Sequence, residues 1–148
     1  MKLNINHNEN YLEGYINLEK NSSFKTDHVV NDYVINSITG NDKIQEIICH
    51  PGALEKSGAG YQEVLKSWAY FSSEDCVIKA KCIDIEAISN ALSAGTIDIS
   101  AFNSILSGYL VFFDRHSFSE ALSSVGFKPK KTWYGPHQWV LNIEASKK

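Results

Sequence analysis

The stretch Lys2-Leu3-Asn4-Ile5-Asn6-His7-Asn8, followed by Gly14-Tyr15-Ile16-Asn17-Leu18-Glu19, decides the fold. Each half runs from apolar residues into polar ones, which predicts two short strands over residues 2–5 and 15–18. Only a polar loop separates them. Because a parallel crossover normally takes about a dozen residues or more, this loop predicts an abbreviated first crossover that contains no helix. A helix N-terminus that could hold a phosphate is therefore not expected at this position.

The remaining sequence alternates strand and helix patterns. Apolar spacing at i, i+3, i+4 and i+7 predicts a helix over residues 61–71. Further helices are expected over 85–94, capped by Asp84, over 101–106, capped by Asp98 or Ser100, and over 118–125, capped by Ser117 with Glu120 as its capping-box partner. Strands are expected over residues 29–30, 44–49, 76–82, 131–134 and 139–145, with turns over 37–42 and 72–75. Strands that alternate with helices predict a three-layer α/β domain spanning residues 1–148, with a mostly parallel sheet and an antiparallel C-terminal hairpin.

Composition restricts the class of protein. The chain has 148 residues, 43% hydrophobic and 21% charged, with a formal net charge of -3. These values predict one folded domain and argue against a general nucleic-acid binder, which needs a basic face. The first ten residues are polar and no apolar run approaches the roughly 18 residues that span a bilayer. Three cysteines without a Cys-x-x-Cys pair predict reduced thiols, a cytoplasmic location and no metal site.

Several segments, in order, resemble a known family. The two opening segments resemble Lys-Leu-Asn-Leu-Gly-Cys/Ser-Gly and Gly-Tyr/Trp-Ile-Asn-Val-Asp of short class I S-adenosylmethionine-dependent methyltransferases of the type 11 kind. Later segments are similar to that family as well: Glu46-Ile47-Ile48 with Leu54-Glu55, Asp114-Arg115-His116, Gly126-Phe127 and Trp139–Lys147. The resemblance implies a trimmed Rossmann-like methyltransferase fold, S-adenosylmethionine as cofactor and a small-molecule or sugar acceptor.

The resemblance also implies the cofactor-binding residues. Asn6, His7 and Asn8 stand at the family's glycine-rich loop, and Glu19 stands where an acid holds the ribose hydroxyls. Both loop glycines are replaced by asparagine, which tolerates left-handed backbone better than other non-glycine residues. The loop can therefore keep its shape while two side chains project toward the volume of the cofactor's methionine moiety. The alternatives are a polar turn at Asn6 and Asn8 and a solvated carboxylate at Glu19.

Two further features are candidates for function. His50 follows a central strand, where α/β sheets bind ligands, and is a candidate general base; the alternative is a half-buried histidine bonded to a loop carbonyl. The C-terminal hairpin carries Trp133, Tyr134, His137 and Trp139. These aromatic side chains either form a stacking platform or dimer contact or cover the sheet edge and core.

Two functional hypotheses remain open. In the first, the chain is a methyltransferase that acts on a small molecule or sugar. In the second, it is a non-catalytic interaction or assembly module that keeps the fold without the cofactor, with a protein partner such as a second copy in a homodimer. The lost glycines, the short first crossover and the polar Ser72-Ser73-Glu74-Asp75 in place of the family's Pro-Gly-Gly favour the second hypothesis.

Overall fold

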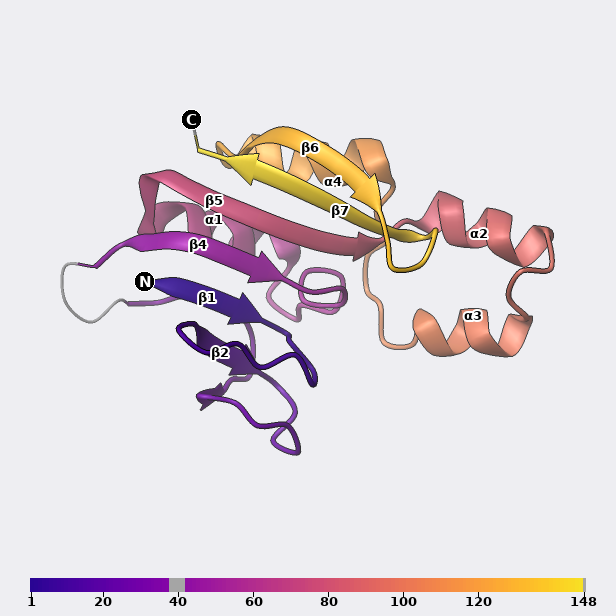
Figure 1. The fold of residues 1–148 in the computed structure, drawn as a ribbon, viewed down its shortest axis with the longest axis horizontal. Helices are drawn as coiled ribbons and strands as arrows, with labels where there is room; N and C mark the ends of the chain where they lie inside the picture. Colours follow the sequence, from indigo (N-terminus) through magenta and orange to yellow (C-terminus); the bar gives the residue numbers. More distant parts are fainter. Residues whose placement is uncertain (38–41, 148) are drawn as a thin grey trace.

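The computed structural model of the protein describes residues 1–37 and 42–147. Its strands are β1 (Lys2–Ile5), β2 (Ile16–Glu19), β3 (His28–Val29), β4 (Ile44–Cys49), β5 (Ser72–Ile83), β6 (Lys128–Tyr134) and β7 (Val140–Ser146). They form one seven-stranded sheet in the order β3-β2-β1-β4-β5-β7-β6 (Figure 1). The first five strands in this order pair in parallel, whereas β7 is antiparallel to both β5 and β6. The predicted mostly parallel sheet with an antiparallel C-terminal hairpin is confirmed.

Four helices accompany the sheet: α1 (Tyr61–Phe71), α2 (Ile85–Ser93), α3 (Ile99–Ile105) and α4 (Arg115–Ser124). Helix α1 has the predicted bounds because its buried face, Val64, Leu65 and Trp68, follows the helical period. Helices α2 and α3 begin at the predicted caps, where the carboxylates of Asp84 and Asp98 accept backbone N–H groups of the first turn.

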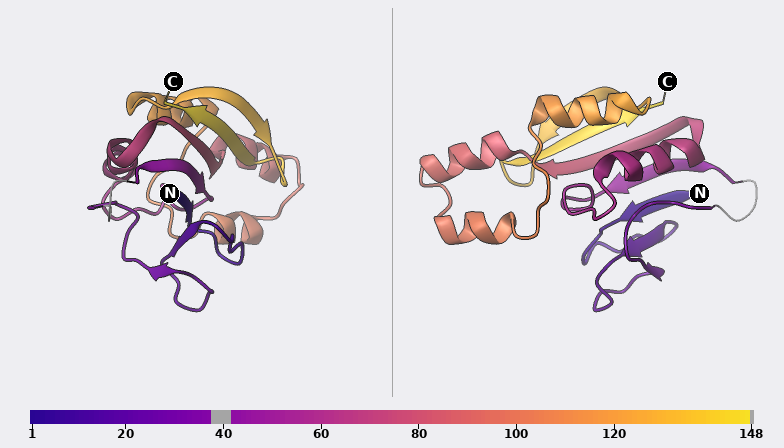
Figure 2. Two further views of the ribbon diagram at one scale, coloured as in Figure 1. Left: turned by 60° about the vertical axis from the view of Figure 1, so that its left-hand side comes forward. Right: turned by 180° about the vertical axis from the view of Figure 1, so that it is seen from behind.

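The helices α1 and α4 pack against one face of the sheet, and α2 and α3 extend beyond the end of β5 (Figure 2). Among the described residues, no helix covers the opposite face, which Figure 1 shows toward the viewer. The trimming of the Rossmann-like fold is thus concentrated in the layer that lies in front of β1, β4 and β5. Its place over β1 and β2 is taken by the loop of residues 6–15, whose backbone carbonyls accept hydrogen bonds from Asn4 and Asn17.

The core lies between the sheet and the layer of α1 and α4. Trp68 is fully buried there, and its indole N–H donates to the carbonyl of Tyr33 over 2.8 Å. This bond ties the segment after β3 to α1 and closes the core over β1 and β2. A second, smaller cluster joins α2 to the end of β5 and the start of β7 through Ile83, Ile88 and Trp139. The described residues include no helix with the length and apolar character to cross a bilayer.

Two local predictions were wrong. Residues 72–75 are not a turn: β5 begins at Ser72, directly after α1, because Ser72 pairs with Ile44 and its hydroxyl donates to the carbonyl of Trp68 over 2.6 Å. Helix α4 is capped by Asp114, not by Ser117. The Asp114 carboxylate accepts the N–H of Ser117 while the Ser117 hydroxyl accepts the N–H of Asp114, so the capping box starts three residues earlier. The turn predicted over 37–42 lies largely outside the described residues.

Candidate functional site

The carboxyl ends of β1, β2 and β4 meet at one edge of the sheet. Strand β1 pairs with β2 on one side and with β4 on the other, so the order in which the chain adds strands to the sheet reverses at β1. Open α/β sheets bind ligands in the crevice at such a reversal. The backbone N–H groups of Asn6 and His50 extend the two ladders by donating to the carbonyls of Leu18 and Ile5. The sequence-predicted residues Asn6, His7, Asn8, Glu19 and His50 are all brought to this edge.

The loop after β1 has the backbone shape that glycine would give it. Asn6 and Asn8 have φ angles of 55° and 53°, and they are the described non-glycine residues with positive φ. The Asn6 side chain is held at both ends: its Nδ2 donates to the carbonyl of Pro51 over 2.7 Å, and its Oδ1 accepts from the hydroxyl of Tyr33 over 2.9 Å. Asn6 therefore fixes the loop against its neighbours as well as turning the chain.

The strain at Asn8 gives a testable contrast. Asn8→Ala is expected to lower the free energy of unfolding by about 1 kcal/mol, because alanine pays about 1–2 kcal/mol in left-handed backbone, which asparagine tolerates better. Asn8→Gly removes that strain and is expected to stay within about 0.5 kcal/mol of the wild type. Urea denaturation of the three proteins measures the contrast, and equal stabilities of the alanine and glycine variants would contradict it.

His7 lies under this loop with no polar partner. Its side chain is fully buried, and both ring nitrogens lack a hydrogen bond among the described residues. The ring packs edge-on against Tyr11, with 6.2 Å between ring centres. His7 thus fills space at the tip of β1 rather than presenting a nitrogen to solvent.

Glu19 is occupied by the protein's own backbone. Only 2% of the residue is exposed. Its Oε2 accepts the N–H of Asn8 over 2.8 Å, and its Oε1 accepts those of Lys20 and Asn21 over 2.9 and 3.3 Å. The carboxylate joins the β1 loop to the end of β2, which is a structural task for the residue that the resemblance assigns to the ribose.

His50 is bonded to a side chain that sequence reasoning did not select. Its Nε2 lies 2.9 Å from Oδ1 of Asn4, whose amide nitrogen already donates to Asn17 Oδ1 and to the carbonyl of Asn10. Nε2 must therefore carry the proton, and Nδ1 keeps a lone pair. Burial, reinforced by the positive charge of Lys81, lowers the pKa of His50 to about 4. The ring is neutral at physiological pH and can accept a proton at Nδ1. Buried Asn4 and Asn17, at inward positions of short strands, were the signal for this network.

Glu55 is a second group that the sequence did not single out for chemistry. It is 1% exposed, and its carboxylate accepts the N–H groups of Gly52 and Ile83 over 3.1 and 3.4 Å. Its backbone carbonyl accepts those of Leu110 and Val111. Burial raises the pKa of Glu55 to about 7, against the lowering by its backbone donors. Glu55 therefore holds together the turn after β4, the end of β5 and the segment that precedes α4. Its carboxyl titrates near neutral pH.

Other residues considered from sequence have structural surroundings. Asp114 is the cap of α4, as described above. The three cysteines are free and buried, and burial raises the pKa of the Cys49 and Cys82 thiols. Within residues 1–37 and 42–147, no group of three or more His, Cys, Asp or Glu side chains is placed to hold a metal ion. In the aromatic hairpin, Trp139 is buried and stacks on His137, whereas Trp133 and Tyr134 are 38% and 41% exposed.

Comparison with known proteins gives matches in structure alone. No protein-family model and no curated protein sequence matches the chain. The plantazolicin methyltransferase BpumL, solved with SAH and a triazolic desmethylPZN analog, superposes with a TM-score of 0.67 at 11% identity, covering 98% of this chain and 75% of its own. A putative methyltransferase of Haloferax volcanii, solved in complex with the Trm112 methyltransferase activator, superposes with a TM-score of 0.65 at 10% identity, covering 99% and 81%.

These two superpositions extend over nearly the whole chain. At such low identity the likeness concerns the fold and not the chemistry of the site. The chain therefore has the fold of the S-adenosylmethionine-dependent methyltransferases, as the resemblance of its opening segments implied.

Proposed function

We propose that this chain is a non-catalytic protein of the methyltransferase fold, which acts as an interaction or assembly module and does not bind S-adenosylmethionine. The observation that carries the proposal is the state of Glu19. This carboxylate is 2% exposed, and both of its oxygens already accept backbone N–H groups, so ribose hydroxyls would have to compete with the protein's own amides for it. Binding a ribose there would first break contacts that hold the loop in place, and the amides left without an acceptor would each be costly.

Two neighbouring side chains support the same conclusion. The asparagine at the first loop position adds an amide group that is already bonded to Pro51 and Tyr33. The next residue, His7, is fully buried under the loop. A glycine-rich loop leaves its backbone open to close approach by a ligand, whereas this loop directs its side chains into contacts with its own fold.

The alternative is a methyltransferase that acts on a small-molecule or sugar acceptor. It is favoured by His50, whose neutral ring keeps a lone pair on Nδ1 at the edge where a ligand would bind. In that case Glu19 and the Asn6–Asn8 loop would hold S-adenosylmethionine, and the reaction would depend mainly on aligning the acceptor with the methyl group.

Calorimetric titration with S-adenosylmethionine and with its demethylated product separates the two hypotheses. The proposal predicts no binding heat at millimolar ligand and no rise in melting temperature, since a ligand that binds the native state stabilises it. Micromolar binding that survives in Asn8→Gly but weakens at least tenfold (about 1.4 kcal/mol) in Glu19→Gln would overturn it. Asn8→Gly serves as the matched control because it removes a side chain of the same loop and keeps the backbone N–H that residue 8 donates to the carboxylate.

A further inference from the structure

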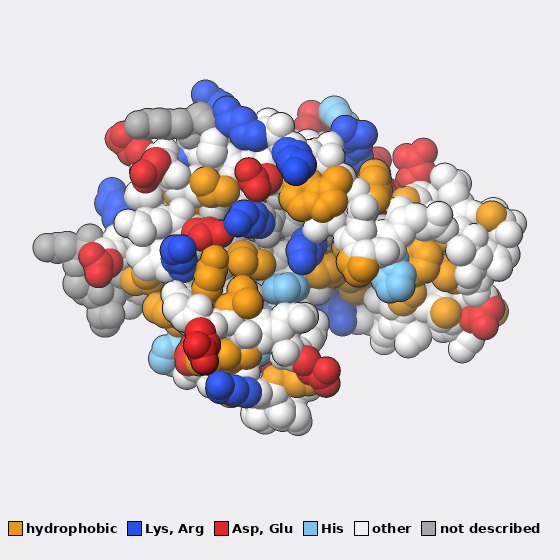
Figure 3. Space-filling view, viewed as in Figure 1, with side chains coloured by type: hydrophobic (Ala, Val, Ile, Leu, Met, Phe, Trp, Pro, Cys, Tyr) orange, Lys and Arg blue, Asp and Glu red, His pale blue; other side chains and the backbone are white. Residues whose placement is uncertain are grey.

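A cavity of about 360 Å³ opens on the face of the sheet that carries no helix in the described residues. Its lining comes from strands β4, β5, β6 and β7 and from Gly135, and does not include the loop after β1 or Glu19. Figure 3 looks onto this face and shows lysine and hydrophobic side chains side by side over these strands. Small-molecule sites commonly have volumes of roughly 300–1,000 Å³, so the cavity has room for a ligand of one or two rings.

Strand register places the lining side chains in rows. Lys81 lies opposite Asn142, and Asn142 lies opposite Trp133. One row nearer the start of β5, Ile48 lies opposite Lys79. Because residues opposite each other in a ladder point to the same face of the sheet, these five side chains surround one space. The space combines an apolar residue, an indole ring, an amide and two ammonium groups.

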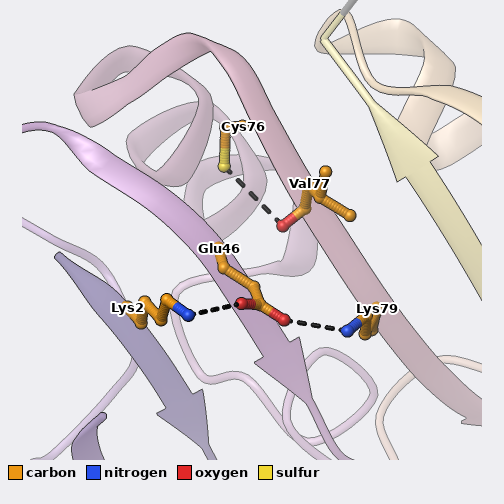
Figure 4. Close-up of polar contacts among 5 residues, drawn as sticks. All are labelled: Lys2, Glu46, Cys76, Val77 and Lys79. Atoms are coloured by element: carbon orange, nitrogen blue, oxygen red, sulfur yellow. Dashed lines mark hydrogen bonds and ion pairs between the residues drawn. The ribbon is translucent and has the colours of Figure 1, made fainter. Parts of the chain in front are cut away.

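The two lysines differ in how much positive charge they have left. Lys79 donates to Glu46 over 2.9 Å, and Glu46 also pairs with Lys2 over 3.3 Å (Figure 4). Lys79 also lies opposite Glu144 in the ladder. The Lys81 ammonium has no acceptor among the described residues. Its positive charge helps to lower the pKa of His50. The uncompensated positive charge of the cavity therefore lies at Lys81.

The other side of the cavity suits a planar ring with a donor group. Trp133 is 38% exposed, and the ammonium of Lys131 lies 5.0 Å from the centre of its ring. Aromatic side chains favour offset or edge-on contact with a second ring. The amide nitrogen of Asn142 donates to the carbonyls of Gly135 and Val140 over 2.8 and 3.2 Å. This fixes the orientation of the amide and leaves its Oδ1 as an acceptor for a ligand N–H or O–H.

We propose that this cavity binds a small aromatic anion, a planar ring that carries a carboxylate or phosphate group, with the ring against Trp133 and Ile48 and the anionic group at Lys81. An anion fits the Lys81 end because the two acidic side chains that pair with or lie opposite a lysine of the cavity, Glu46 and Glu144, do so at Lys79. The inference goes beyond the proposed function and does not depend on it, because none of the cavity residues belongs to the Asn6–Asn8 loop or to Glu19.

The experiment is a titration of the ¹⁵N-labelled full chain followed by NMR. The probes are indole-3-carboxylate and uridine 5′-monophosphate, which carry ring and charge, inorganic phosphate, which lacks the ring, and indole, which lacks the charge. Saturable shifts are expected at the Trp133 indole N–H, assigned with Trp133→Phe, and at the amides of Lys81 and Asn142. At least one of the first two probes is expected to bind, and phosphate alone and indole alone are expected to bind at least about tenfold more weakly than the tighter of the two.

Variants distinguish the cavity from general attraction to lysines. Lys81→Met is expected to weaken binding of the tighter probe about tenfold, the order of one charge-assisted hydrogen bond. Lys130→Met, which removes an exposed lysine of β6 outside the cavity, is expected to leave the affinity unchanged. Lys130 is exposed and Lys81 is half-buried with no acceptor among the described residues, so unchanged melting temperatures are expected to show that both variants fold. Equal weakening by both variants, shifts confined to the Asn6–Asn8 loop, or no saturation by either ring-bearing anion would overturn the proposal.

Discussion

Glu19→Ala is expected to lower the free energy of unfolding by about 3–5 kcal/mol, since hydrogen bonds to a charged group contribute about 1.5–3 kcal/mol each and are not fully additive. The carboxylate accepts the N–H groups of Asn8, Lys20 and Asn21, and alanine leaves all three without an acceptor. Because Glu19 is 2% exposed, water reaches these amides only if the loop opens. Urea denaturation of the variant measures the loss.

Two comparisons make this result specific to the buried carboxylate. Glu19→Gln keeps one carbonyl oxygen and is expected to lose about half as much stability. Glu13→Ala removes an exposed acid from the same loop and is expected to change the stability by less than about 0.5 kcal/mol. A Glu19→Ala protein as stable as the Glu13→Ala control would show that the carboxylate is free, and would reopen its assignment as a ribose ligand.

The second large effect is a dependence of stability on pH that originates at Glu55. In the unfolded chain this carboxyl ionises around its ordinary pKa of 4.5, and in the folded protein burial raises the pKa to about 7. Between these values the unfolded state binds fewer protons than the folded state, so the free energy of unfolding falls as pH rises. The difference between 4.5 and about 7 corresponds to about 3 kcal/mol at this site.

His50 acts in the opposite direction over much of the same range. Its pKa falls from 6.5 to about 4 on folding. Between these values the unfolded state binds more protons, so the free energy of unfolding rises with pH. The wild-type profile is therefore expected to be flatter between the two ordinary pKa values than either group alone would make it. Only a variant can separate the two contributions.

Glu55→Gln removes the falling contribution and leaves the rising one. The stability of the wild type minus that of the variant is expected to fall by about 3 kcal/mol from about pH 4 to about pH 8. Replacing one oxygen by an amide nitrogen disturbs the bond to Gly52 or Ile83, which adds an offset that does not change with pH. Glu120→Gln, at a side chain that is 71% exposed, is the matched control. A wild-type-minus-Glu55→Gln difference that stays constant with pH would contradict a buried, neutral Glu55.

Local patterns accounted for the features that depend on neighbouring residues. The bounds of α1 follow from apolar spacing alone, and the caps Asp84 and Asp98 follow from short-range hydrogen bonds. The left-handed backbone of Asn6 and Asn8 also follows from what asparagine tolerates, once the resemblance marks those positions as glycine sites. The errors lay where two local signals competed. At α4, Asp114 caps the helix in place of Ser117, which becomes its capping-box partner.

The candidate site depended on contacts that local patterns do not contain. Asn4 and His50 are 46 residues apart and bond only because β1 and β4 are adjacent in the sheet. Glu55 and Ile83 are 28 residues apart and meet only where the connections after β4 and β5 fold together. No spacing rule predicts that one carboxylate is satisfied by its own backbone or that another is almost completely buried.

By itself, the sequence determined the strand and helix order, the missing first crossover helix and the positions of the loop residues, because these depend on periodicity, turn chemistry and chain length. Only the tertiary structure decided what those residues do. It placed Glu19 against three amides, made His50 neutral through burial and Lys81, and left a cationic cavity beside Trp133 on the face that no described helix covers. The physical reason is that burial and hydrogen-bond partners depend on which strands are neighbours in the sheet. The order of the strands in turn depends on packing between residues that are far apart in the sequence.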